Sequence, residues 1–234
     1  MGDKTHILRA VLLGELKPLG AQAVPSGIDK QAASGSVEVG PEGLAGDHQG
    51  DRKNHGGPEK AIHHYPYDHY TWWRSRYPEL APQLEGPGRF GENISTRGLC
   101  EADVCIGDVF RLGSAVVQVS QGRQPCWRLN ARFAEKTMAR RVQESARTGW
   151  YYRVLESGRV ATGDTLELLE RPAEGWSLQR ILHLLYRDTL NREALSGLAE
   201  LPELADSWRV LARRRLDRAA VEDWTGRLET PQQA

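Results

Sequence analysis

The pattern of apolar positions along the chain changes near residue 172, where short stretches give way to helical spacing. Before this point, apolar runs of a few residues alternate with Gly- and Pro-containing turns, as short β-strands do. The extended segments predicted in this part are residues 5–13, 36–39, 60–65, 104–112, 115–120 and 159–169. Residues 104–112 and 115–120, with Gly113 and Ser114 between them, predict a hairpin, and residues 159–169 contain a further pair of strands hinged at Gly163 and Asp164. The close spacing of turn signals between them predicts a mainly antiparallel, β-barrel-like domain over residues 1–172.

Helical patterns interrupt and then follow these strands. Two helices are predicted inside the first domain, over residues 66–77 and 133–148. Beyond it, one helix face carries the apolar residues Leu178, Ile181, Leu182 and Leu185. Asn191 is a candidate cap for a second helix, Pro202 begins a third, and a last short apolar segment ends at Leu228. The predicted fold is therefore mainly β with added α: a β-barrel-like domain and a small C-terminal three-helix domain over residues 173–234.

Charge and composition exclude several classes of protein. Lys and Arg together number 31, as do Asp and Glu, so the net charge is zero. This balance argues against a surface built to bind nucleic acid or an anionic membrane. No apolar run approaches the roughly 20 residues of a membrane helix, and the N-terminus lacks the pattern of a signal peptide. Three cysteines, an odd number, predict no disulfide framework and a cytoplasmic, reducing location.

The most polar stretch of the first domain, residues 46–61, is a candidate ligand-binding loop. Gly56 and Gly57 lack a Cβ, so their backbone amides can approach an anion closely, and Lys60 adds a positive charge. The alternative is a solvated loop with a glycine turn. Downstream, Asn93 in the segment FGEN offers a two-sided amide suited to the edge of a heterocycle, or else caps a turn.

Five of the seven histidines lie within 22 residues: His48, His55, His63, His64 and His69. They form no known zinc motif, and His63 and His64 are neighbours on a predicted strand, so their side chains face opposite ways. A zinc site is therefore disfavoured. A single histidine that acts on a ligand is the better interpretation.

The segment after the predicted hairpin, residues 120–128, contains the strongest candidate for a reactive group. Cys126 lies between Arg123 and Arg128, and positive neighbours favour the thiolate that attacks or binds soft metals. The alternative is a small buried cysteine. Cys100 and Cys105 have acidic neighbours and are interpreted as structural.

Several of these segments together resemble the MOSC domain family, in particular its YiiM-type branch with a C-terminal three-helix extension. The matching text is SGIDK, GLAGDHQGDRKNHGGPEKAIHHYPYDHY, FGENIST, IGDVFRLGSAVVQVSQGRQPCWRLN and GRVATGDTLELLER. These pieces cover most of residues 26–171, and their order makes the resemblance specific.

The resemblance implies a β-barrel-like fold that binds the molybdenum cofactor and reduces N-hydroxylated compounds, including hydroxylaminopurine-type bases, to amines. The motif SQ-x-R-x-P-C assigns the metal's thiolate ligand to Cys126, with His55 as a candidate proton source. The residues assigned to cofactor binding are Lys30, His55, Gly56, Gly57, Lys60, Asn93, Ser120, Gln121, Arg123 and Cys126.

Electrons for such a reaction must come from another protein. The three cysteines cannot hold a plant-type iron–sulfur cluster, and the chain has no G-x-G-x-x-G fingerprint, so a separate reductase, a flavoprotein, is the expected partner. Two alternatives stay open: a sulfur-carrying module with a persulfide on Cys126, and a module that docks a partner through the basic stretch 213–218.

Overall fold

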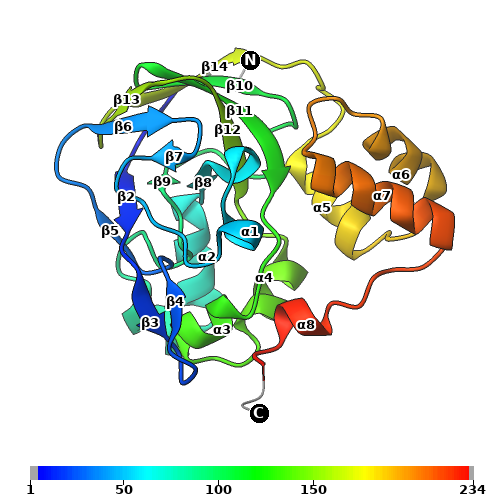
Figure 1. The fold of residues 1–234 in the computed structure, drawn as a ribbon, viewed down its shortest axis with the longest axis horizontal. Helices are drawn as coiled ribbons and strands as arrows, with labels where there is room; N and C mark the ends of the chain where they lie inside the picture. Colours follow the sequence, from blue (N-terminus) through cyan, green and yellow to red (C-terminus); the bar gives the residue numbers. More distant parts are fainter. Residues whose placement is uncertain (1–4, 232–234) are drawn as a thin grey trace.

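The structure is a computed structural model that describes residues 5–231. Its centre is a curled, half-barrel sheet of nine strands (Figure 1). Their order is β1 (Thr5–Ile7), β14 (Thr165–Glu170), β10 (Val109–Leu112), β11 (Ala115–Gly122), β12 (Trp150–Glu156), β8 (Ile62–His64), β9 (Ile94–Ser95), β2 (Ala10–Gly14) and β5 (Lys30–Ala32). Among the described strands, every pairing in this sheet is antiparallel except that of β8 with β9. The mainly β prediction for the first domain is confirmed.

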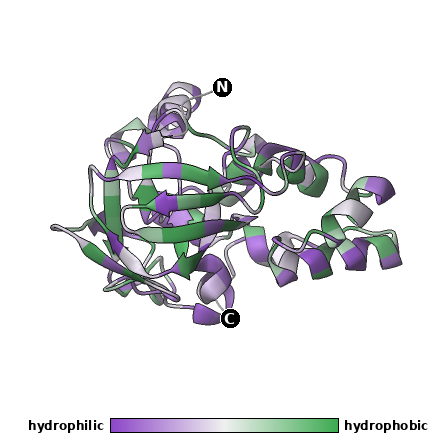
Figure 2. Ribbon diagram, turned by 90° about the horizontal axis from the view of Figure 1, so that it is seen from above, coloured by the Kyte–Doolittle hydropathy of each residue, from purple (hydrophilic) through white to green (hydrophobic). Residues whose placement is uncertain are grey.

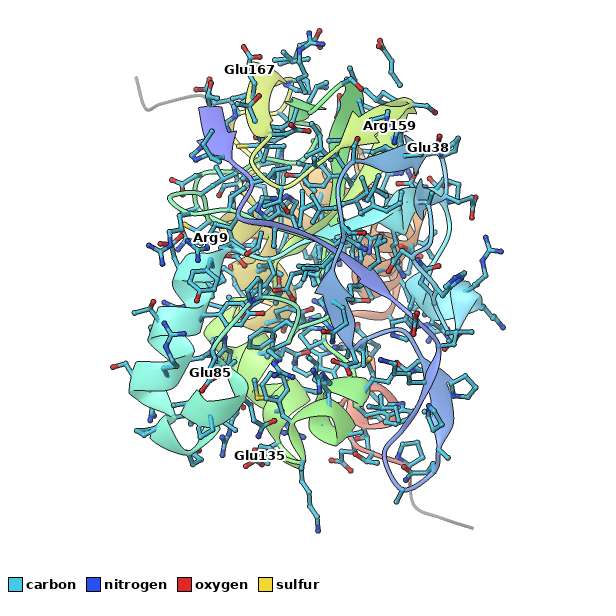
Figure 3. The ribbon with its side chains drawn as sticks, turned by 90° about the vertical axis from the view of Figure 1, so that its left-hand side faces the viewer. Arg9, Glu38, Glu85, Glu135, Arg159 and Glu167 are labelled. Atoms are coloured by element: carbon cyan, nitrogen blue, oxygen red, sulfur yellow. The ribbon has the colours of Figure 1, made fainter. Side chains whose placement is uncertain are left out.

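Two smaller sheets flank the large one. One contains β13 (Gly158–Val160), β6 (Val37–Gly40) and β7 (Gly43–Leu44), and the other contains β3 (Lys17–Leu19) and β4 (Val24–Ser26). Arg159 of β13 and Glu38 of β6 form a cross-strand ion pair of 3.2 Å at an exposed edge (Figure 3).

Helices surround the strands. In the first domain they are α1 (Arg52–His55), α2 (Tyr67–Arg76), α3 (Arg128–Phe133) and α4 (Met138–Ser145), with two 3₁₀ turns, η1 (Pro58–Lys60) and η2 (Pro78–Gln83). The helical domain contains α5 (Leu178–Tyr186), α6 (Arg192–Ala199) and α7 (Asp206–Arg218), and α8 (Thr225–Leu228) follows it. No helix within residues 5–231 is long and apolar enough to cross a lipid bilayer.

The apolar core has two parts. The larger lies against the curled sheet and continues into the helical domain, so Trp150 of β12 and Leu182 of α5 belong to one cluster. The smaller fills the space among α2, α3 and α4, where Trp73 and Phe90 are fully buried. Figure 2 shows the resulting mixture of apolar and polar positions along strands and helices. Burial on this scale is the main stabilising contribution to such a fold.

The helical domain is joined to the sheet by main-chain hydrogen bonds as well as apolar contact. The amide of Leu178 donates to Val104 O at 2.8 Å, and that of Ala205 donates to Ser120 O at 2.9 Å. After α7 the chain returns to the first domain, and α8 lies beside α3 and α4 (Figure 1). There Leu228 is buried in the smaller core cluster, and its carbonyl accepts from Asn130 Nδ2 at 2.8 Å.

Several predicted boundaries differ from the structure. The single strand predicted over residues 5–13 is two strands, because Leu8 bonds to Asp164 and Arg9 to Ser95, so β1 and β2 pair with different partners. The helix predicted over 133–148 is α4 alone, and α3 precedes it. The predicted strand 104–112 begins only at Val109, since residues 104–108 form a turn joined to the helical domain.

Candidate active site

Cys126 lies where strand β11 leaves the sheet. The strand ends at Gly122, and four residues later Cys126 precedes α3, with its carbonyl accepting from Leu129 N at 2.9 Å. The residue is only 8% exposed. A rigid strand on one side and a helix on the other therefore fix the thiol at the wall of a cleft.

A one-turn helix brings His55 to this thiol. Asp51 caps α1, accepting from Asn54 N at 3.2 Å, which is the usual way a short helix begins. His55 Nε2 lies 3.2 Å from Cys126 Sγ, and His55 Nδ1 lies 3.6 Å from Asp51 Oδ2. Residues 71 positions apart thus form a carboxylate–imidazole–thiol series.

This arrangement changes the acidity of the thiol. Burial raises the pKa of Cys126, but the hydrogen bond and charge of His55 and the charge of Arg123 outweigh it and lower the pKa to about 7. By contrast, burial and Asp103 raise the pKa of Cys100 to about 11. Cys126 is therefore the cysteine with substantial thiolate character near neutral pH.

Positive side chains surround the cleft. Lys30 forms a buried ion pair with Asp47, and Lys60 Nζ donates to Asn54 O at 2.7 Å. Burial lowers the pKa of Lys60, whereas the charges of Cys126 and Asp51 oppose this change. The cleft therefore combines cations with a thiolate, which suits an anionic ligand that also carries a soft metal.

The cleft consists of two pockets that meet at the thiol. The first pocket has a cavity of about 70 Å³, and the second has a larger cavity of about 480 Å³. Both pockets are lined by Asp51, His55, Lys60, Cys126, Arg128 and Tyr151. A group bound at Cys126 Sγ would therefore face both of them.

Three buried polar atoms at the cleft have no hydrogen-bond partner: Arg123 Nη1, Gln121 Oε1 and His55 Nδ1. Arg123 is 6% exposed and lines the first pocket, and Gln121 is 2% exposed and lines the second. Leaving such atoms unpaired is unfavourable, so a ligand that bonds to Arg123 Nη1 or Gln121 Oε1 would remove this penalty. The guanidinium donor suits a phosphate, and the amide acceptor suits an N–H group of a bound ring.

The structure brings most of the predicted site residues to the cleft. Those lining the first pocket are Lys30, His55, Lys60, Asn93, Arg123 and Cys126, while Gln121 lines the second. The Asn93 amide is already engaged, since its Oδ1 accepts from His63 N and its Nδ2 donates to Leu12 O. Asn93 therefore joins β2 to β8 and has little capacity left for a ligand.

Three predicted residues line neither pocket. Gly56 and Gly57 come after α1 has ended, and the Gly56 amide bonds back to Arg52 O instead of pointing to a ligand. Ser120 is fully buried, and its hydroxyl lies 2.6 Å from Glu59 O and 3.1 Å from Tyr151 O. Ser120 therefore acts indirectly, by holding the turn that carries Lys60 against β11 and β12.

Three other residues of the cleft were not assigned to ligand binding from the sequence. Tyr151 lies on β12, where the run WYYRV carries a strand signal of aromatic and β-branched residues. Arg128 lies 3.5 Å from Asp51 across the mouth. Arg227, which lines the second pocket, comes from the end of the chain, so no local pattern relates it to Cys126.

The neighbouring histidines His63 and His64 face opposite ways, as predicted for a strand. His63 lines the first pocket, and burial together with the charge of Arg123 lowers its pKa well below the usual value. His64 is bonded on the other face to Thr96 and Tyr152. Within residues 5–231, no three His, Cys, Asp or Glu side chains are grouped so as to hold a metal ion.

The curled sheet, the thiol at the end of β11 and the appended three helices define a known class of protein. Residues 51–167 match the MOSC domain, and residues 176–219 match the YiiM-like, 3-alpha helix domain. The chain therefore belongs to the MOSC family, in its YiiM-like branch, and this resemblance is confirmed.

Individual relatives agree with this assignment. The chain is 44% identical over 195 residues to the uncharacterized protein YflK of Bacillus subtilis (strain 168), covering 83% of this chain and 86% of YflK. A crystal structure of YiiM from Escherichia coli has a TM-score of 0.78 at 32% identity, covering 92% of this chain and 100% of that one. A protein of Gibberella moniliformis (strain M3125 / FGSC 7600) named "Reductase" is 36% identical over 225 residues, which are 95% of this chain but 39% of the fungal protein.

Proposed function

We propose that this protein is a molybdenum-cofactor-dependent reductase that converts N-hydroxylated compounds, such as hydroxylaminopurine-type bases, to the corresponding amines. The observation that carries the proposal is a buried thiol with a pKa of about 7, in a cleft where a buried guanidinium nitrogen has no partner. A soft thiolate beside cations is the donor set that a phosphorylated dithiolene cofactor with a soft-ligated metal requires.

The residues of the first pocket would hold the cofactor. Cys126 Sγ would ligate the metal, and Arg123, Lys60 and Lys30 would provide positive charge for the phosphate. When bound, the cofactor would supply two electrons that, together with two protons from the site and solvent, reduce an N–OH group to N–H with release of one water molecule.

The protein's own contribution is electrostatic and positional. His55 Nε2 lies 3.2 Å from Cys126 Sγ, and a proton on it would keep the sulfur anionic and ready to bind metal. With a metal held at the sulfur, the same proton would be available to a substrate oxygen in the cleft. Tyr151 lines both pockets, and buried His63 lines the first, so their side chains would occupy space around a ligand bound at the thiol.

Electron delivery would require a partner. The Gibberella protein named "Reductase" is much longer than this chain, which matches 39% of it. We propose that a separate flavoprotein reductase delivers electrons to this chain. In a longer protein, additional domains would deliver them.

The test is the cofactor content of protein purified from a host that makes the molybdenum cofactor. We expect molybdenum and pterin near one per chain in the wild type and a strong loss in Cys126→Ala. Cys105→Ala is the matched control, because Cys105 is also buried but lines neither pocket. Equal molybdenum in wild type and Cys126→Ala would remove the thiolate role, and absence of both molybdenum and pterin from the wild type would refute the proposal.

Activity is then measured with the loaded protein, a flavin reductase and 6-hydroxylaminopurine. We expect adenine to form at a rate that depends on molybdenum content. A persulfide on Cys126 in protein without molybdenum, detected by mass spectrometry, would support the sulfur-carrier alternative instead.

A further inference from the structure

The second pocket has one wall that belongs to neither domain. Gln121, Gln124 and Trp127 come from the end of β11 and the start of α3, whereas Asp223, Gly226 and Arg227 come from the end of the chain. The three C-terminal residues lie within Glu222–Leu228, called the return segment below. This segment lies outside both family matches, which end at residues 167 and 219.

The return segment is fixed at its first end to the helical domain. Glu222 forms an ion pair of 2.7 Å with Arg215 of α7, which is 1% exposed and also donates to Leu185 O at 3.0 Å. Trp224 Nε1 donates to Glu222 at 2.8 Å, and the Trp224 ring meets Tyr186 edge-on at 5.9 Å. A buried, bidentate arginine–carboxylate pair of this kind holds a fixed geometry.

Its second end is fixed to the first domain, directly beside the thiol. Arg227 donates to Pro125 O, the residue before Cys126, and to Gln143 Oε1 at 2.6 Å. The Arg227 carbonyl accepts from Trp127 N at 2.8 Å, and the next residue, Leu228, is 2% exposed. Hydrogen bonds and an ion pair therefore fix the return segment at both of its ends, along one side of the second pocket.

Gln121, in the lining of the pocket, has a buried polar atom without a partner. Its side chain is 2% exposed, and Oε1 accepts no hydrogen bond from the protein. An unpaired buried acceptor selects a ligand that presents an N–H donor and penalises one that presents a second acceptor. The volume of about 480 Å³ is in the range of pockets that enclose a small heterocycle.

These observations lead to one inference, which rests on the function proposed above. We infer that the second pocket is the substrate compartment, that Gln121 Oε1 binds an N–H group of a planar nitrogen heterocycle, and that the return segment forms the wall that limits substrate size. The charged residues of the first pocket then hold the cofactor at its phosphate, and Cys126 lies at the boundary between the two pockets.

The wall is tested on cofactor-free protein with two maleimides that react alike but differ in size, N-ethylmaleimide and a fluorescein maleimide. Mass spectrometry measures modification of Cys126. Arg227→Gln removes charge-assisted hydrogen bonds, so the rate ratio of large to small reagent should rise about tenfold. Arg227→Lys should restore part of the size selectivity, and Arg214→Gln, on the exposed face of α7, is the control expected to match wild type.

A second variant acts in the opposite direction. A Cβ built on Gly226 meets no atom within 4 Å, so Gly226→Phe should fold normally and project its ring into free space at the pocket. We expect it to lower the same ratio about tenfold. If Arg227→Gln does not fold, Gly226→Phe alone tests the role of the return segment as a wall. An unchanged ratio in Gly226→Phe, or equal acceleration of both reagents in Arg227→Gln, would overturn the assignment of the wall.

The ligand class is tested by NMR titration with 9-methyladenine and with 9-methylpurine, which has no N–H group. 9-Methyladenine should bind the wild type, and Gln121→Met should weaken this binding about tenfold while leaving that of 9-methylpurine unchanged. Equal effects on both ligands, or no binding of 9-methyladenine, would refute the role of Gln121. Because these experiments need no molybdenum, an intact compartment in a protein that never takes up cofactor would disprove the proposed function alone.

Discussion

Replacement of His55 by alanine should change the acidity of Cys126 more than any other single substitution at the cleft. The imidazole lies 3.2 Å from the sulfur, and its hydrogen bond and charge are the largest effects that lower the thiol pKa. Arg123 contributes less, and burial acts in the opposite direction. Without His55, burial is no longer outweighed, so the pKa should return at least to its ordinary value of 9.0.

The size of the effect follows from these values. Moving the pKa from about 7 to 9.0 removes about 2.7 kcal/mol of thiolate stabilisation. At pH 7 the thiolate fraction then falls from about one half to about one hundredth. Since a more basic thiolate is a stronger nucleophile, part of the loss is recovered, and the alkylation rate at pH 7 should fall only about fivefold.

The assay is the rate of iodoacetamide modification of Cys126 between pH 5.5 and 10 in cofactor-free protein. The wild-type rate should rise with pH and reach half its maximum near pH 7, because the thiolate is the reacting form. In His55→Ala the midpoint should move above pH 9, whereas His48→Ala, which removes another histidine of the same pocket, should keep the wild-type profile. A wild-type midpoint near 9, or identical profiles for His55→Ala and wild type, would refute this reasoning.

Two further predictions concern the scaffold of the site. Glu101→Ala should lower the free energy of unfolding by about 3–5 kcal/mol in urea, because it leaves buried His69 and the amide of Thr148 without their carboxylate; a loss below about 1 kcal/mol would contradict the assigned pairing. Gly27→Ala should lower both the Tm and the molybdenum content, since its Cβ would lie 1.8 Å from His48 O and must displace the loop that lines the first pocket; wild-type loading would contradict the close approach.

Sequence periodicity predicted those elements whose pattern is local. The hairpin of β10 and β11 around Gly113 is confirmed, and Gly113 has the positive φ of 58° that the turn requires. The predicted pair within residues 159–169 is real as two extended segments, but β13 pairs with β6 and β14 with β10. Partner choice is a long-range property, so alternation within a segment cannot reveal it.

The candidate site likewise combines residues that a local sequence pattern identifies with residues that only the fold brings together. Cys126 and His55 were singled out from charge and residue type, and the structure brings them into contact. Arg227 was not, because only the three-dimensional course of the return segment brings it beside Pro125. Gly56 and Gly57 have the local freedom to form an anion site, but α1 directs them away from both pockets.

The cleft at Cys126 contains buried polar atoms that have no hydrogen-bond partner. Each such atom destabilises a folded chain by about 1–3 kcal/mol, which is a large fraction of a typical domain's stability. Three of the eight such atoms within residues 5–231, Arg123 Nη1, Gln121 Oε1 and His55 Nδ1, belong to residues that line the two pockets at Cys126. Elsewhere buried charges are paired, as in Glu101 with His69 and Arg215 with Glu222. Unpaired polar groups in the lining of a cleft that also contains a thiolate are the expected form of a site completed by its ligand.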